Sequence, residues 1–274
     1  MDSADAYAAR IDACAAQNAR LTRPGADRWA SRAAMFNLDP RRPLEANTAA
    51  VAALVASEDS VIDVGGGAGR VCLPIALNCR EVINVEPSAG MREQFEIAAR
   101  EAGITNARCL DGGWPAAATG LQADVVMLAN VTYFVRDIVP FIQALDRTAR
   151  KRVVIAVWSV PPPNHSATLF ELLHGEPQER VPTHRELLAV LWDLGLLPSL
   201  QLLPDPFRGG RMRPPTPEDG VKLALQSASA EHLEGARGIV EAHFAELFEH
   251  TAEGYVPRWM PDARELLITW EPRG

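Results

Sequence analysis

Short apolar runs alternate with amphipathic segments through the middle of the chain, and this is the most regular pattern in the sequence. Each run is four or five residues long, rich in β-branched residues and nearly continuous in apolarity, as a strand covered on both faces must be. Strand, helix and strand at this spacing predict right-handed crossovers, and therefore a doubly wound α/β fold with a mostly parallel sheet. The expected strands are residues 61–64, 82–85, 107–110, 125–129 and 153–157.

The helices between these strands have recognisable ends. Ser88 can cap a helix that stops at Gly103, and Asp137 can cap the next one. Thr183 and Glu186 have the spacing of a capping box, in which each side chain bonds to the backbone N–H of the other residue. These signals support helices between the strands and another helix beyond them.

The flanks of the core are less regular. Helices are expected over residues 5–21 and 43–56, a loop over the sheet from Pro161, and a last long helix over 231–252. Two further strands are expected at 200–203 and 266–270. The chain divides into an N-terminal helical cap (1–58), a cofactor-binding core (59–160) and a C-terminal half of the sheet with a helical insertion (161–274), as one compact domain.

Composition narrows the class of protein. With 274 residues, 47% of them apolar, the chain can bury a core without disulfides. The net charge of −8 argues against a nucleic-acid or anionic-membrane surface. Without a bilayer-spanning run or an apolar leader, a cytoplasmic protein is expected, and the rarity of lysine suggests a bacterial source. The cysteines lack metal-ligand spacing, which predicts free thiols and no metal site: Cys14, Cys72, Cys79 and Cys109.

Residues 61–70, with the sequence VIDVGGGAGR, are a strand that runs into a glycine-rich turn. Such a turn lets a ligand lie against bare backbone, and the helix after it is expected to offer free N–H groups to an anionic group. Glu86 stands at the end of the second strand, 21 residues after Gly65. A carboxylate there can accept hydrogen bonds from both hydroxyls of a ribose, so a nucleoside-containing ligand is implied.

The fine spacing bears on which nucleoside cofactor binds. The dinucleotide fingerprint requires glycine at position 70, where Arg70 stands; the chain instead has Gly-x-Gly-x-Gly, with Asp63 two residues ahead. This weakens but leaves open an NAD(P)-dependent oxidoreductase. A non-catalytic module that binds a nucleoside cofactor is a second alternative.

From residue 59 to 160 the chain resembles the class I S-adenosylmethionine-dependent methyltransferases. The run 61–69 is similar to the first motif of that family, the sequence from Glu86 to Met91 to its second-strand motif, and 123–137 to its fourth-strand motif. The resemblance implies a Rossmann-like, seven-stranded sheet with an antiparallel last strand. It also implies S-adenosylmethionine as the cofactor, with Glu86 on the ribose and Asn130 near the methionyl end.

One departure concerns the adenine. The family commonly has Gly-Asp after the third strand, whereas this chain reads Asp111-Gly112-Gly113-Trp114-Pro115. Either Asp111 or groups near Gly113 and Trp114 are therefore candidates for the adenine contact. The cofactor-binding residues that the resemblance implies are Asp63, Gly65, Gly66, Gly67, Gly69, Glu86, Pro87, Asp111, Gly113, Trp114 and Asn130.

Three residues are candidates for catalysis, and each of them could instead have a structural role. Tyr133 either lines the substrate site or packs beneath a helix, and His165 and His184 are either general bases or a loop and a helix-start histidine. Tyr7 and Trp29 either pack against the rest of the protein or belong to an N-terminal lid over the cofactor.

The acceptor is expected to be a small molecule. The run 130–133 reads Asn-Val-Thr-Tyr and lacks the two prolines typical of nucleic-acid amino methyltransferases, which agrees with the acidic charge. The arginine-rich segment 208–213 is either a solvated loop or a contact for an anionic substrate. We expect no membrane partner, and the oligomeric state stays open.

Overall fold

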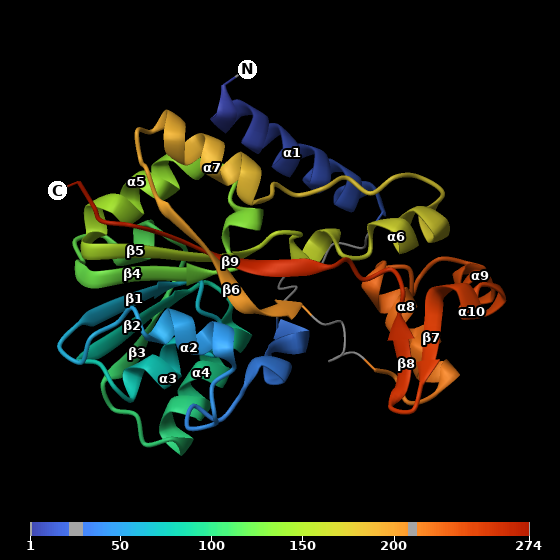
Figure 1. Ribbon diagram of the computed structural model, residues 1–274, viewed down its shortest axis with the longest axis horizontal. Coiled ribbons are helices and arrows are strands. Elements are labelled where there is room, and N and C mark those ends of the chain that lie inside the picture. The colour runs from blue at the N-terminus through green and yellow to red at the C-terminus, as the bar shows by residue number, and fades with distance from the viewer. Residues whose placement is uncertain (1, 22–29, 208–212, 274) are drawn as a thin grey trace.

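The computed structural model describes residues 2–21, 30–207 and 213–273. Its centre is a seven-stranded sheet in the order β3-β2-β1-β4-β5-β9-β6 (Figure 1). Strand β9 is antiparallel to both of its neighbours, and the other strands run in one direction. The strands are β1 (Ser60–Val64), β2 (Glu81–Glu86), β3 (Ala107–Asp111), β4 (Ala123–Ala129), β5 (Ala149–Trp158), β6 (Ser199–Phe207) and β9 (Ala263–Trp270).

Helices cover both faces of this sheet, which confirms the doubly wound α/β fold (Figure 1). On one face lie α1 (Ser3–Leu21), α5 (Ile138–Thr148) and α7 (His184–Asp193), and on the other α2 (Ala46–Ala52), α3 (Cys72–Ala76) and α4 (Ala89–Glu101). Successive strand residues point to opposite faces, so Ile62 joins the first hydrophobic cluster and Val61 the second. Burial on both sides explains why the strand sequences are almost continuously apolar.

Several predicted helix ends are confirmed. The Ser88 hydroxyl accepts a hydrogen bond from the Met91 amide at the start of α4, and Gly103 follows that helix with φ of +62°. Thr183 and Glu186 form the expected capping box. Asp137 does precede α5, but its side chain makes no capping bond and pairs with Arg136 instead.

A third hydrophobic cluster lies to one side of the sheet, in the C-terminal insertion (Figure 1). It joins α6 (Ala167–His174), α8 (Pro217–Ser227), α9 (Ala236–Ala242), α10 (Phe244–Leu247) and a hairpin of β7 (Phe248–Thr251) with β8 (Gly254–Pro257). The single long helix predicted over 231–252 is therefore wrong. Gly235 and His243 leave helical geometry, and the turn before Gly254 closes a hairpin that buries Phe248.

Other differences from the predicted elements are smaller. β3 is an edge strand and is only partly covered, and the helix predicted over 43–56 is confined to α2. The stretch after Pro161 contains α6 rather than loop alone. Four short 3₁₀ segments complete the described structure: η1 (Ala30–Phe36), η2 (Ala116–Ala118), η3 (Thr132–Phe134) and η4 (Pro162–Asn164).

Two further observations bear on the sequence predictions. The four cysteines are free thiols, as expected, and three of them are buried. In the described ranges, no helix combines the length and the apolar character needed to cross a membrane.

Candidate functional site

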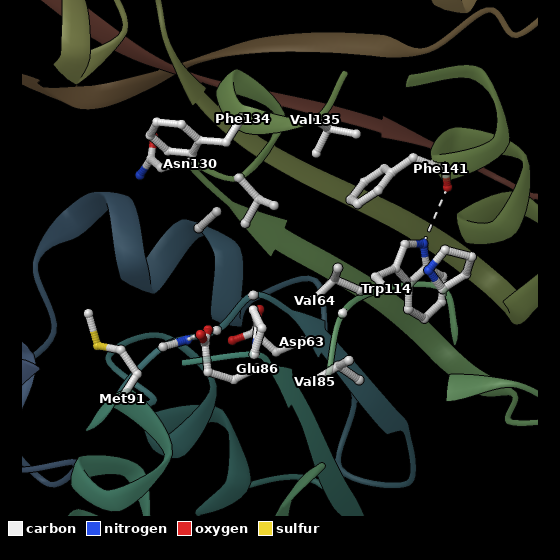
Figure 2. A pocket seen from close by; sticks show the side chains of 18 of the residues that line it. Asp63, Val64, Val85, Glu86, Met91, Trp114, Asn130, Phe134, Val135 and Phe141 are labelled. Carbon is white, nitrogen blue, oxygen red and sulfur yellow. Dashed lines mark hydrogen bonds between the residues drawn. The ribbon is translucent and has the colours of Figure 1, made fainter. Parts of the chain in front are cut away.

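A cavity of about 800 Å³ opens where β1, β2 and β4 end at the carboxyl edge of the sheet (Figure 2). The strand order reverses between β1 and β4, and a crevice at such a switch point is the usual ligand site of an open α/β sheet. Nine of the predicted cofactor residues line the cavity: Asp63, Gly65, Gly66, Gly67, Glu86, Pro87, Gly113, Trp114 and Asn130.

The glycine-rich turn forms one wall of the cavity, and its geometry requires glycine. Gly65 and Gly67 have φ of +67° and +57°, a region that residues with a Cβ rarely adopt. At Gly66 the obstacle is steric, since an added Cβ would stand 2.3 Å from Oδ2 of Asp63. The turn therefore brings bare backbone to the cavity.

The turn's amides are largely committed within the protein. The Gly65 amide donates to the Val85 carbonyl, the Gly66 amide to Oδ1 of Asn84 and the Gly67 amide to Oε2 of Glu86, at 2.8, 3.1 and 3.0 Å. The helix after the turn, α3, is only five residues long, so the anion-binding helix end expected from the sequence is weak. Both features disfavour a pyrophosphate against this turn.

Glu86 is held rigidly at the end of β2. Its side chain is buried, with Oε2 accepting from the Gly67 amide and Oε1 from the Ser88 amide at 2.8 Å. Figure 2 shows Glu86 beside Asp63 next to the turn. The arrangement fits a ligand that presents hydroxyl groups.

Asp63 is 1% exposed, and burial raises the pKa of its carboxyl from 3.8 to about 7. The Cys72 side chain hydrogen-bonds to it and opposes this rise, whereas the negative charge of Glu86 adds to it. Within the described residues, Oδ1 of Asp63 is buried without a hydrogen-bond partner. A buried acceptor of this kind suits a ligand that brings a donor or a positive charge.

Trp114 and Phe141 form the opposite, apolar end of the cavity (Figure 2). The Trp114 indole N–H donates to the Phe141 carbonyl at 3.3 Å, which fixes the ring orientation. The Asp111 side chain is 75% exposed, pairs with Arg92 at 2.8 Å and lies outside the cavity lining. Of the two candidate adenine contacts, the structure brings only the Gly113–Trp114 group to the cavity.

Tyr133 lies behind the cavity instead of lining it. It is 2% exposed, and its hydroxyl donates to Oδ1 of Asn130 at 3.2 Å and accepts from the Trp158 amide at 2.5 Å. Burial raises its pKa well above the usual value. Tyr133 therefore contacts residues of the cavity lining, Asn130 and Phe134, without facing the cavity itself.

The other candidates also lie outside the cavity lining. His165 is buried with Nε2 at 2.9 Å from the Val160 carbonyl, and burial lowers the pKa of both His165 and His184. Gly69, with φ of +82°, packs against Leu73 and Phe95. The packing interpretation of Tyr7 is confirmed, because its buried hydroxyl donates to the Thr132 carbonyl at 2.6 Å.

Sequence reasoning missed most of the apolar wall and the charged rim. These residues come from loops, from the 3₁₀ segments η1 and η3 and from the first turns of α4 and α5, and no pattern in the sequence marks them as ligand contacts; they are Phe36, Val71, Met91, Val131, Phe134, Val135, Arg136, Asp137 and Phe141. Trp29 and residues 208–212 of the arginine-rich segment lie outside the described residues.

Comparison with known proteins agrees with this geometry. Residues 62–157 match a family model described as a methyltransferase domain. The YcgJ protein from Bacillus subtilis is 16% identical, with 83% of this chain and 98% of that chain covered and a TM-score of 0.54. A SAM-dependent methyltransferase from Thiobacillus denitrificans, solved with S-adenosyl-L-homocysteine, is 12% identical, with 90% and 98% covered and a TM-score of 0.51.

Both of these structures share the fold of this chain. No curated protein sequence matches the chain. The strand order, with β9 antiparallel between β5 and β6, is the one that the family resemblance implies. Residues 62–157 of this chain are therefore similar to a methyltransferase domain, and the sheet that contains them has the fold that the resemblance to the class I S-adenosylmethionine-dependent methyltransferases implies.

Proposed function

We propose that the protein transfers a methyl group from S-adenosylmethionine, bound in the cavity at the ends of β1, β2 and β4, to a small-molecule acceptor. The observation that carries this proposal is the Glu86 carboxylate, which two backbone amides fix beside a glycine turn that only glycine can form. When bound, the cofactor supplies an electrophilic methyl group on a positively charged sulfur.

The lining residues fit the parts of this cofactor. Glu86 would accept hydrogen bonds from the ribose hydroxyls, and Trp114 would offer a ring face to the adenine. Asn130 borders the opposite end, where the methionyl group would lie. The buried carboxyls of Asp63 and Glu86 favour a cation over a pyrophosphate, which supports a sulfonium cofactor over a dinucleotide.

A small-molecule acceptor is supported by the size and lining of the cavity. Its volume of about 800 Å³ lies in the upper part of the roughly 300–1,000 Å³ of typical small-molecule sites. Phe36 and Phe134 stand on its lining, and apolar walls of this kind exclude water from a reacting centre. The net charge of −8 weighs against a nucleic-acid acceptor.

Calorimetric titration tests the proposal directly. S-adenosylmethionine and S-adenosylhomocysteine should bind to the wild-type protein, NADH should not, and Glu86→Ala should lose most of the affinity. Asp111→Ala is the matched control, because its carboxylate lies outside the cavity and pairs with Arg92. Tight binding of NADH with no binding of the first two would overturn the proposal, and turnover on an acceptor panel would separate an enzyme from a binding module.

The setting and the division of the chain stay predictions from the sequence. We infer a bacterial, cytoplasmic protein from composition, which immunodetection in fractions of the source cells would check. The proposed single domain, with a cap at 1–58, a core at 59–160 and a C-terminal half at 161–274, predicts one cooperative unfolding transition in calorimetry.

A further inference from the structure

A ring of hydrogen-bonded groups lies behind the end of β4. The Asn130 side chain accepts from the Tyr133 hydroxyl, which in turn accepts from the backbone amide of Trp158 on β5. Trp158 pairs in register with Glu265 on β9, and the Glu265 carboxylate hydrogen-bonds to the Asn130 side chain. Asn47 donates to the same carboxylate at 3.0 Å. The ring therefore connects the cavity edge to strands far from it in the chain.

The backbone of Asn130 is strained at this point. Its φ is +63°, in the left-handed region that non-glycine residues leave unless their surroundings hold them. Its amide donates to the Ala156 carbonyl at 2.9 Å, which continues the pairing of β4 with β5. Both ends of its side-chain amide are committed, the oxygen to Tyr133 and the nitrogen to Glu265. The side chain of Asn130 is therefore held from two sides.

Glu265 is the carboxylate of this ring, and it hydrogen-bonds to Asn130 directly. The residue is 8% exposed, and a buried carboxylate is tolerated only when donors and charges compensate it. Asn47 and Asn130 supply the donors, and the positive charge of Arg70, which lines the cavity, adds to them. Loss of the Glu265 carboxylate would remove the hydrogen bond that holds the Asn130 side chain from β9.

We propose that Glu265 is a positioning residue, which holds Asn130 in the left-handed conformation that shapes the methionyl end of the cofactor cavity. It lines no part of the cavity and acts through Asn130. The inference rests on the proposed placement of S-adenosylmethionine in this cavity.

The test combines a variant that lacks the Glu265 carboxylate with a variant in which residue 130 no longer needs to be held by it. Glu265→Ala should weaken calorimetric binding of S-adenosylhomocysteine about tenfold, or about 1.4 kcal/mol. Asn130→Gly lets residue 130 take the left-handed conformation without Glu265, because glycine adopts a positive φ without strain, and the affinity of this variant is the reference for the double variant. The double variant should bind like Asn130→Gly alone, so that glycine rescues the loss at residue 265.

Asp124→Asn is the control for removing a buried carboxylate. Asp124 is 7% exposed at the start of β4, at the opposite end of that strand from Asn130, and accepts from Ser60. This variant should bind S-adenosylhomocysteine like the wild type. Glu265→Gln, which keeps the side-chain volume, replaces Glu265→Ala throughout if the alanine variant does not fold.

Each result decides a different question. Unchanged affinity in the Glu265 variant, or a double variant that binds clearly more weakly than Asn130→Gly alone, would overturn the positioning role. Failure of the wild-type protein itself to bind would instead refute the placement of the cofactor.

Discussion

Asp63→Asn should change how the stability of the fold depends on pH. In the wild-type protein burial raises the pKa of Asp63 from 3.8 to about 7, so between these values the folded state binds more protons than the unfolded state. The free energy of unfolding therefore falls as the pH rises through this window. Asparagine does not titrate, so the variant lacks this contribution.

The size of the effect follows from the shift. A rise from 3.8 to about 7 is about 3 pH units, and each unit corresponds to about 1.4 kcal/mol, which gives about 4 kcal/mol for complete titration. Below pH 4 the carboxyl is neutral in both states and costs nothing. Above pH 7 the charge must be buried and the full cost applies. Titrating groups that do not interact with Asp63 contribute to both proteins alike and cancel in the comparison.

Urea unfolding of the two proteins at pH 5 and pH 8 measures this difference. From pH 5 to pH 8 the wild-type protein should lose about 2–3 kcal/mol of stability relative to Asp63→Asn. The change is smaller than the value for complete titration because the unfolded carboxyl is already largely ionised at pH 5. Stability differences that are equal at the two pH values would refute the assignment of a raised pKa to Asp63.

Three further substitutions probe the cavity. Gly66→Ala should lower the free energy of unfolding by about 1–3 kcal/mol, because its Cβ would stand 2.3 Å from Asp63, and urea unfolding would show it. Glu86→Gln should weaken S-adenosylhomocysteine binding at least about tenfold in a calorimetric titration, because hydrogen bonds to a charged acceptor contribute about 1.5–3 kcal/mol. The control, Glu81→Gln at the far end of β2, should bind normally. If the Trp114 ring stacks on the adenine, Trp114→Ala should weaken S-adenosylhomocysteine binding about tenfold and Trp114→Phe should weaken it far less. Equal losses in the two variants would exclude stacking.

Much of the fold could be predicted because its signals are local. The strands around Ile62 and Val126 are buried on both faces, which makes them continuously apolar, and Ser88 and Thr183 mark helix starts through bonds to residues within the next turn. The glycines of the turn can also be recognised in the sequence, because the backbone geometry of the turn requires glycine. Each of these features depends on residues close together in the sequence.

The rest could not be predicted because it depends on distant partners. Glu265 reaches Asn130 across more than a hundred residues, and nothing in the spacing of either residue marks the pair. Asp111 pairs with Arg92 outside the cavity lining, so its place at the end of β3 did not make it an adenine contact. Residues 231–252 are apolar at helical spacing in part, yet Phe248 is buried from a hairpin strand.

The central claim is that S-adenosylmethionine binds in the cavity with its ribose on Glu86. A crystal structure of the protein with S-adenosylhomocysteine tests it most directly. The account predicts the ribose hydroxyls within hydrogen-bond distance of the Glu86 carboxylate, the adenine against Trp114 and the homocysteine end beside Asn130. A ligand bound elsewhere, or one in this cavity with its ribose away from Glu86, would contradict it.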